Sequence, residues 1–171
     1  MLYITYGGFM KKILILILTC LMLSSNICVA ANDDNQPIIT AKNKKFDVFA
    51  ATYVLSGDVY IQHKSRTVKA DYAEYNLLKQ IVKAKGNITF VDGDFAASCQ
   101  TLIAYITEEN VDLADNVSFR RDDLAITANT ANFNWQSKLA VFRQNVKIND
   151  QGKRHKSELA TYSINSGELK F

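Results

Sequence analysis

Hydrophobic residues along the chain return to the same position every 29 residues, in four copies without an insertion. Two neighbouring columns show the pattern most clearly: Val59, Ile88, Val117 and Val146, and two residues later Ile61, Phe90, Phe119 and Ile148. Apolar residues two positions apart predict a strand with one buried face, and a fixed period of this length indicates stacked units. We therefore expect an all-β chain of four 29-residue hairpin repeats, with its function spread along a continuous surface.

Each copy carries two signals for a bend. The alternation breaks between Ala70 and Ala73 and at the equivalent places of the later copies, which predicts a bulge or sharp bend there. The other strand of each copy contains a pair of residues that tolerate unusual backbone angles. These pairs are Gly57-Asp58, Gly86-Asn87, Asp115-Asn116 and Gln144-Asn145. Each copy is then two long bent strands joined by turns, and four copies give about eight such strands.

The apolar series continues to the end of the chain. Its members in one column are Leu55, Ala84, Leu113, Phe142 and finally Phe171. Stacked repeat proteins usually close their ends with polar capping units. The sequence therefore predicts an apolar interior without a cap at its C-terminal end.

The first 30 residues have the form of a secretory signal peptide. Lys11 and Lys12 precede an apolar run over 13–23, and small residues follow up to Ala30. The run is shorter than the about 20 residues of a comfortable membrane span, so cleavage near Ala30 is expected. Met10 is an alternative natural start. The remaining residues, 31–171, are expected to form one domain in the exported compartment.

The charge balance gives no indication of nucleic-acid binding. The chain has 20 basic and 17 acidic residues, and without Lys11 and Lys12 the exported part is close to neutral. A nucleic-acid-binding domain would need a dominant basic face. No such partner is expected.

Candidate catalytic and metal-binding residues are sparse. His63 and His155 are the only histidines, and neither has a second ligand at metal spacing. Cys99 is the one cysteine outside the leader and occupies a column of small inward residues, so it is expected to be buried and unpaired. We expect no enzymatic activity, no metal and no cofactor.

Four segments resemble the OstA-like (LptA) family of lipopolysaccharide-transport domains. They are residues 35–38 (NQPI), 53–59 (YVLSGDV), 68–75 (VKADYAEY) and 82–88 (VKAKGNI). The resemblance covers about residues 35–171. It implies a twisted, V-shaped, open β-jelly roll in the periplasm, whose apolar groove shelters the acyl chains of lipopolysaccharide. It also implies LptC-like and LptD-like jelly-roll partners at the two ends, with head-to-tail assembly of like copies as a further option.

Nine residues are candidates for the interior groove. Ile38 is taken from the family's opening motif, and the others come from the repeat columns: Leu55, Val59, Ile61, Phe90, Leu102, Phe119, Phe133 and Phe142. Two alternatives stay open. The chain could be an LptC-like component with a retained membrane anchor, or a structural β-repeat protein whose aromatic residues form a filled core.

Overall fold

The structure is a computed structural model that describes residues 38–171. The predicted signal peptide, the alternative start at Met10, the cleavage site near Ala30 and the domain boundary at residue 31 lie outside the described residues. Residues 38–171 contain no helix with the length and hydrophobicity needed to cross a membrane.

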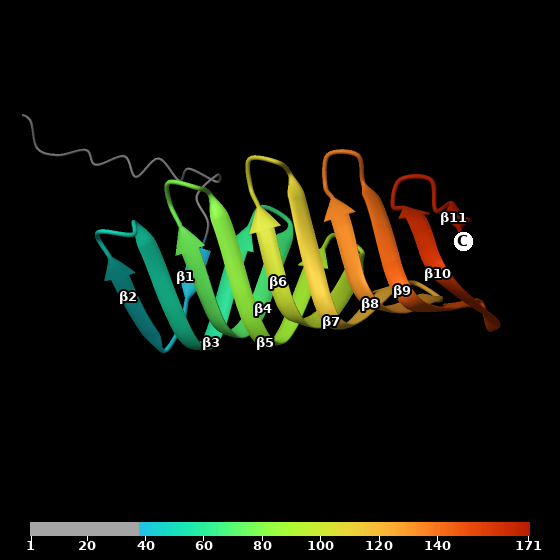
Figure 1. The fold of residues 1–171 in the computed structure, drawn as a ribbon, viewed down its shortest axis with the longest axis horizontal. Helices are drawn as coiled ribbons and strands as arrows, with labels where there is room; N and C mark the ends of the chain where they lie inside the picture. The colour runs from blue at the N-terminus through green and yellow to red at the C-terminus, as the bar shows by residue number, and fades with distance from the viewer. Residues whose placement is uncertain (1–37) are drawn as a thin grey trace, which may run out of the picture. The chain divides into compact units, whose positions relative to one another are not determined.

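The described chain forms one open antiparallel sheet of eleven strands (Figure 1). The strands are β1 (Ile38–Thr40), β2 (Asn43–Asp47), β3 (Thr52–His63), β4 (Arg66–Asn76), β5 (Ile81–Asp92), β6 (Phe95–Tyr105), β7 (Asn110–Arg121), β8 (Leu124–Asn134), β9 (Leu139–Asp150), β10 (Lys153–Ser163) and β11 (Leu169–Lys170). The long strands β3 to β10 pair in chain order, while β1 and β2 both pair with β3. The all-β repeat architecture predicted from the sequence is confirmed.

The 29-residue period has a direct structural cause. Each copy consists of a 12-residue strand, a two-residue turn, an 11-residue strand and a four-residue turn. The four-residue turns repeat the same backbone bond one period apart: the N–H of Leu77 donates to the carbonyl of Ala51, and that of Ile106 donates to Gln80. The equal spacing keeps every copy in register with the one before it.

A bulge lies in the middle of each pair of long strands. Between β3 and β4, Gly57 and Asp58 together stand opposite the single residue Asp71. Both bulge residues have left-handed backbone angles, with φ of +74° and +50°. The same arrangement recurs in the other three copies, at residues 86–87, 115–116 and 144–145.

The bend predicted between Ala70 and Ala73 is present, but its extra residue lies on the neighbouring strand. Ala70 and Ala73 are both buried, and the register of β4 shifts between them. The extra residue lies on the 12-residue strands because the Gly, Asn, Asp and Gln residues there tolerate left-handed backbone angles. The small inward residues of the 11-residue strands, such as Ala70, are less suited to such angles.

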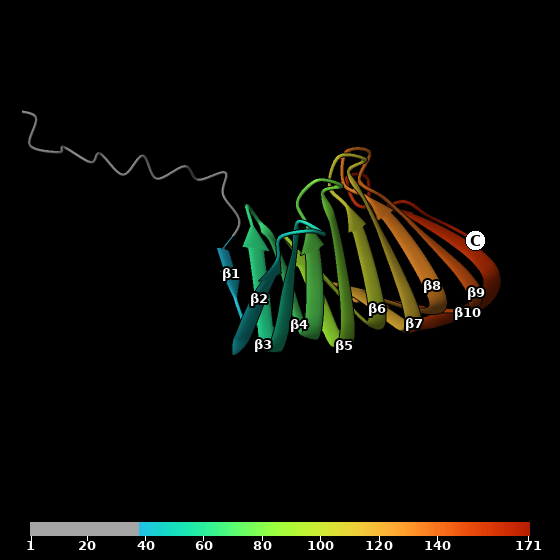
Figure 2. The same ribbon diagram turned by 60° about the vertical axis from the view of Figure 1, so that its left-hand side comes forward.

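The bends fold the sheet into two facing leaves, as the curved strands in Figure 2 show. We call the side containing Thr52–Ser56 and its paired segments the first leaf, and the side containing Val59–His63 and its paired segments the second leaf. The buried hydrophobic residues of both leaves form one core between them. The V-shaped, open jelly roll expected from the sequence is the observed fold.

The C-terminal end differs from the uncapped apolar end that the sequence predicts. On β10 the inward positions of the second leaf become Lys153, His155 and Ser157, where earlier copies place residues such as Leu124. Phe171 is 56 % exposed instead of buried, and its ring centroid lies 4.7 Å from that of His155. Strand β10 is therefore polar on its second-leaf side, which the apolar column of the first leaf does not reveal.

We predict that Gly86→Ala destabilises the fold more than Gly93→Ala. Both glycines have positive φ, where a side chain costs about 1–2 kcal/mol. At Gly86 the new Cβ would also lie 2.6 Å from Oδ2 of Asp71, whereas nothing lies within 4 Å at Gly93. Urea denaturation followed by circular dichroism should show a loss of about 2–3 kcal/mol for Gly86→Ala and about 1 kcal/mol for the control. Equal losses would contradict the steric role of Gly86.

Candidate functional site

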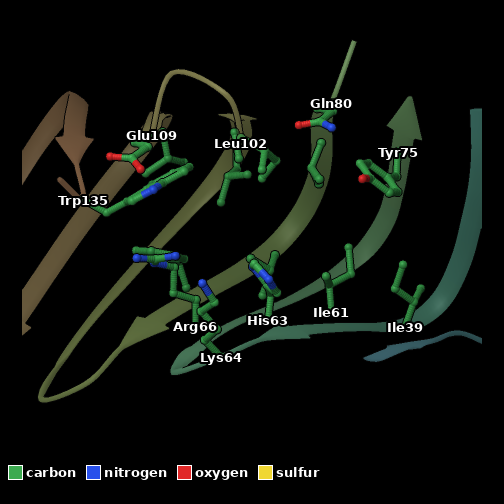
Figure 3. Close-up of a pocket in the computed structure, with 16 residues that line it drawn as sticks. Ile39, Ile61, His63, Lys64, Arg66, Tyr75, Gln80, Leu102, Glu109 and Trp135 are labelled. Carbon is green, nitrogen blue, oxygen red and sulfur yellow. The ribbon is translucent and has the colours of Figure 1, made fainter. Parts of the chain in front are cut away.

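A cavity of about 540 Å³ lies between the two leaves in the N-terminal half of the sheet (Figure 3). Its wall is mainly apolar and includes Ile39, Ile61, Phe90, Leu102 and Val111. These side chains come from β1, β3, β5, β6 and β7, so several repeats contribute to one space. The cavity can hold an apolar group that no single hairpin could enclose.

The rim of the cavity is polar, and the two leaves contribute different side chains to it. His63, Lys64 and Arg66 line it from the turn between β3 and β4, and Figure 3 shows them together at one side. Gln80 and Glu109 line it from turns of the first leaf. An apolar wall with a charged rim suits an amphipathic ligand, whose polar group would stay at the opening.

The interior face of the first leaf is uncovered at the N-terminal end. Phe46 on β2 pairs with Tyr53 on β3, and Tyr53 pairs with Tyr75 on β4. The rings of Phe46 and Tyr53 are 4.7 Å apart and remain 41 % and 38 % exposed, while Tyr75 lines the cavity. This row of aromatic residues leads from the open end of the sheet to the cavity.

Three of the nine candidate interior residues line the cavity. They are Ile61, Phe90 and Leu102. Leu55 and Val59 are buried on either side of the first bulge. Ile38 departs from the prediction, because its side chain is 56 % exposed and Ile39 takes the inward position opposite Ile61. Successive side chains of a strand point to opposite faces, so a one-residue shift decides which isoleucine faces inward.

The other three candidates belong to an aromatic cluster that joins the leaves. Phe119 of the second leaf lies 5.4 Å from Phe142 of the first, in an edge-on arrangement. Phe133 of the first leaf lies 5.0 Å from Phe95 of the second, also edge-on. All four are at most 4 % exposed. The interior is therefore filled by aromatic rings here, so the uniform apolar columns of the sequence conceal two different regions.

A buried carboxylate connects the two leaves beside the cavity. Asp92, at the end of β5, is 5 % exposed. Its carboxylate accepts a hydrogen bond from Ser65 at 2.8 Å and lies 3.3 Å from Nε of Arg66, both on the second leaf. Nζ of Lys138, from a turn of the first leaf, lies 3.4 Å from the same carboxylate. The two cations offset the cost of burying this charge.

Arg66 makes a further contact across the opening. Its guanidinium lies 4.9 Å from the ring centroid of Trp135, which lines the cavity from the first leaf. Arginine over an indole face is a favourable cation–π geometry. Asp92, Arg66, Lys138 and Trp135 thus form a cross-leaf contact at the cavity rim, which we call the Asp92 contact.

A second cross-leaf contact lies farther along the sheet. Arg121 forms an ion pair of 2.7 Å with Asp94, donates a hydrogen bond of 3.1 Å to the hydroxyl of Tyr162, and donates another to the carbonyl of Ile164. Arg121 and Asp92 are one period apart, so the same column supplies opposite charges to equivalent places. The sequence contained this spacing, but the partners from the other leaf could be found only in three dimensions.

Cys99 is buried and unpaired, as expected. Its thiol donates to the carbonyl of Thr101 at 3.2 Å. Burial raises the pKa of this thiol from 9.0 to about 11, because the thiolate would lose its hydration. The cysteine is therefore held as a neutral packing residue.

Within residues 38–171 no group of three or more His, Cys, Asp or Glu side chains is placed to hold a metal ion. The cavity rim carries Arg66, which is engaged with Asp92. The arrangement is suited to enclosing a ligand.

Comparison with known proteins identifies the family of the chain. The model of the family described as OstA-like protein matches residues 36–169. The LPS-assembly protein LptD of Photobacterium profundum is 32% identical over 94 residues, which are 51% of this chain and only 12% of that protein.

A solved structure has a similar fold. LptH of Pseudomonas aeruginosa, the LptA-homologous periplasmic component of the lipopolysaccharide transport device, superposes with a TM-score of 0.61. The match covers 65% of this chain and 84% of LptH at 14% identity. This likeness supports the jelly-roll fold.

We predict that Asp92→Asn destabilises the two-leaf arrangement. Removal of the charge leaves Arg66 and Lys138 beside each other without their shared partner, so the free energy of unfolding should fall by about 2–3 kcal/mol. Asp94→Asn is the matched control, because that side chain is 55% exposed and its loss should cost less than about 1 kcal/mol. Urea denaturation measures the free energy of unfolding of both variants. A larger loss in Asp94→Asn than in Asp92→Asn would refute the role assigned to Asp92.

We also predict that Cys99 makes stability depend on pH between about 9 and 11. The unfolded chain loses its thiol proton from about pH 9, whereas the folded chain keeps it up to about pH 11. The unfolded state therefore binds fewer protons in this range, and stability falls as pH rises. The unfolding free energy of the native protein relative to Cys99→Ala should decrease from pH 9 towards pH 11, and a constant difference would contradict the prediction.

Proposed function

Because this chain belongs to the OstA-like family, we propose that it is a periplasmic lipopolysaccharide-binding protein that carries its cargo from the inner to the outer membrane. The observation that supports the proposal most is the inter-leaf cavity, with its apolar wall and charged rim. Lipopolysaccharide has the matching chemistry, since its acyl chains require shelter from water while its sugars and phosphates remain hydrated.

The energetic need for such a carrier is large. Each methylene group removed from water contributes about 0.8 kcal/mol, so several acyl chains cannot cross an aqueous space unprotected at a useful rate. The wall residues Ile61, Phe90 and Leu102 supply apolar surface, and His63 and Lys64 at the rim are suited to an anionic head group.

The size of the cavity indicates how much of the cargo it can hold as it stands. Its 540 Å³ is within the range of about 300–1,000 Å³ that suits one small ligand. A lipid with several acyl chains needs more space, so loading requires the leaves to separate. The Asp92 contact and the aromatic cluster around Phe119 and Phe133 are the interactions that such a separation would break.

The ends of the sheet are suited to partner strands. Lys153–Ser157 of β10 pairs with β9 on one side and has no partner strand on the other within residues 38–171. An unpaired strand edge can add the strand of another protein by backbone hydrogen bonds. LptC-like and LptD-like jelly rolls are the proposed partners at the two ends, with head-to-tail pairing of like copies as an alternative.

Two other functions predict different results. An LptC-like component would keep its N-terminal leader as a membrane anchor, which N-terminal sequencing of the exported protein would detect. A structural β-repeat protein is favoured by the aromatic cluster, which fills part of the interior as a fixed core would. In that case no lipid should be found with the protein.

The decisive experiment places a photo-crosslinking amino acid at Phe90 in cells. Phe90 is 4 % exposed and lines the cavity, so irradiation should produce an adduct with lipopolysaccharide. Thr89 is the matched control, because it is the adjacent residue on the same strand and its side chain is on the exposed outer face. The adduct yield is expected to be at least about tenfold higher at position 90 than at position 89, because an apolar ligand avoids the water-exposed outer face. A folded protein without an adduct at position 90, or with equal yields at both positions, would refute the proposal.

A further inference from the structure

The most exposed large apolar side chains lie at the tips of two neighbouring turns. Phe49, between β2 and β3, is 102 % exposed, and Val48 beside it is 74 % exposed. Leu78, between β4 and β5, is 82 % exposed. These three residues, which we call the apolar tips, make no contribution to the core, and the cavity does not include them.

The repeat shows that the fold does not require apolar residues at these tips. Phe49 and Leu78 occupy one column of the 29-residue period, and the same column continues with Thr107, Gln136 and Asn165. All five residues are exposed in the turns along one edge of the sheet. The column is therefore apolar in the first two turns and polar in the later ones. Because polar residues occupy the equivalent turns, the turn itself does not require apolar side chains at positions 49 and 78.

The two turns are held side by side. The N–H of Leu77 donates to the carbonyl of Ala51 at 2.9 Å, and Nδ2 of Asn76 donates to the carbonyl of Ala50 at 2.9 Å. Figure 1 shows the four-residue turns in a row along the upper edge of the sheet, with those after β2 and β4 at one end. The apolar tips therefore project from the same edge as a pair.

Basic residues flank the apolar tips. Lys45 and Lys79 are exposed within four residues of Phe49 and Leu78, respectively. Asp47, the last residue of β2, accepts a hydrogen bond from the N–H of Ala50 at 3.0 Å. The next turn of the row carries Glu108 and Glu109, and Lys138 of the turn after it lies 3.4 Å from the carboxylate of Asp92.

We propose that the apolar tips insert into the interface of an anionic lipid bilayer. Projecting apolar side chains with lysines beside them are the composition that favours such an interface, because the apolar groups enter the acyl boundary while the lysines meet anionic head groups. Three projecting side chains are few for a protein partner, since a specific protein interface uses roughly 20–30 residues on each side.

The contact would bring the cavity close to its source of lipid. Gln80 ends the turn that carries Leu78, and Gln80 also lines the cavity rim. A bilayer in contact with the tips would therefore lie beside the polar opening. Contact between the tips and a bilayer does not depend on which lipid occupies the cavity.

The test compares the exported protein with the double variant Phe49→Thr and Leu78→Gln. These substitutions copy Thr107 and Gln136 from the same column, so the turns should keep their structure. Sedimentation with vesicles of phosphatidylglycerol and phosphatidylethanolamine should show binding that weakens with salt, and vesicles of phosphatidylcholine alone should bind less. The double variant should partition about tenfold less, because two large apolar side chains no longer enter the lipid.

The control variant is Thr107→Ser with Gln136→Asn, which alters the same column in later copies and should bind vesicles like the native protein. Equal sedimentation of the native protein and the double variant, or no sedimentation of either, would overturn the proposal. Loss of a protein crosslink in the double variant, with vesicle binding unchanged, would assign the tips to a protein partner and overturn it as well. Crosslinking of lipopolysaccharide at position 90 is measured on the same variants, so failure of the cargo assignment is detected separately.

Discussion

The structure depends on the pair of left-handed residues in the middle of each 12-residue strand. An antiparallel sheet with eight long strands would otherwise extend as one twisted layer, with one face exposed to water. The bulge at Gly86 and Asn87, and its equivalents one period apart, bend every strand pair at the same height. Because the bends are aligned, the two halves of the sheet face each other and can bury a common interior.

The interior between the leaves is not uniform. In the N-terminal half the facing side chains leave a cavity, whereas farther along Phe95, Phe119, Phe133 and Phe142 meet across the leaves. A protein that only stacked its repeats would gain from close packing throughout. The interior therefore combines a cavity in the N-terminal half with a packed aromatic region beyond it.

Charged residues at the strand ends connect the leaves where apolar packing stops. Asp92 and Arg121 stand one period apart in the same column, and each finds partners from the opposite leaf. Such pairs contribute little when exposed, but Asp92 is buried and cannot lose its partners without a substantial cost. These contacts therefore hold the two leaves together at the strand ends.

The sequence by itself determined the eight long strands and the places where they bend, whereas the short strands β1, β2 and β11 were not predicted. These properties follow from local patterns: alternating side chains, a fixed period, and residues that accept left-handed angles at positions such as Gly57 and Asn87. The tertiary structure alone decided which interior residues line a cavity, because that depends on which side chains of the two leaves meet. Phe90 and Phe119 occupy the same column, yet the first faces the cavity and the second packs against Phe142. The partners of Asp92 and the inward position of Ile39 likewise required the register between strands, which no single segment of the sequence specifies.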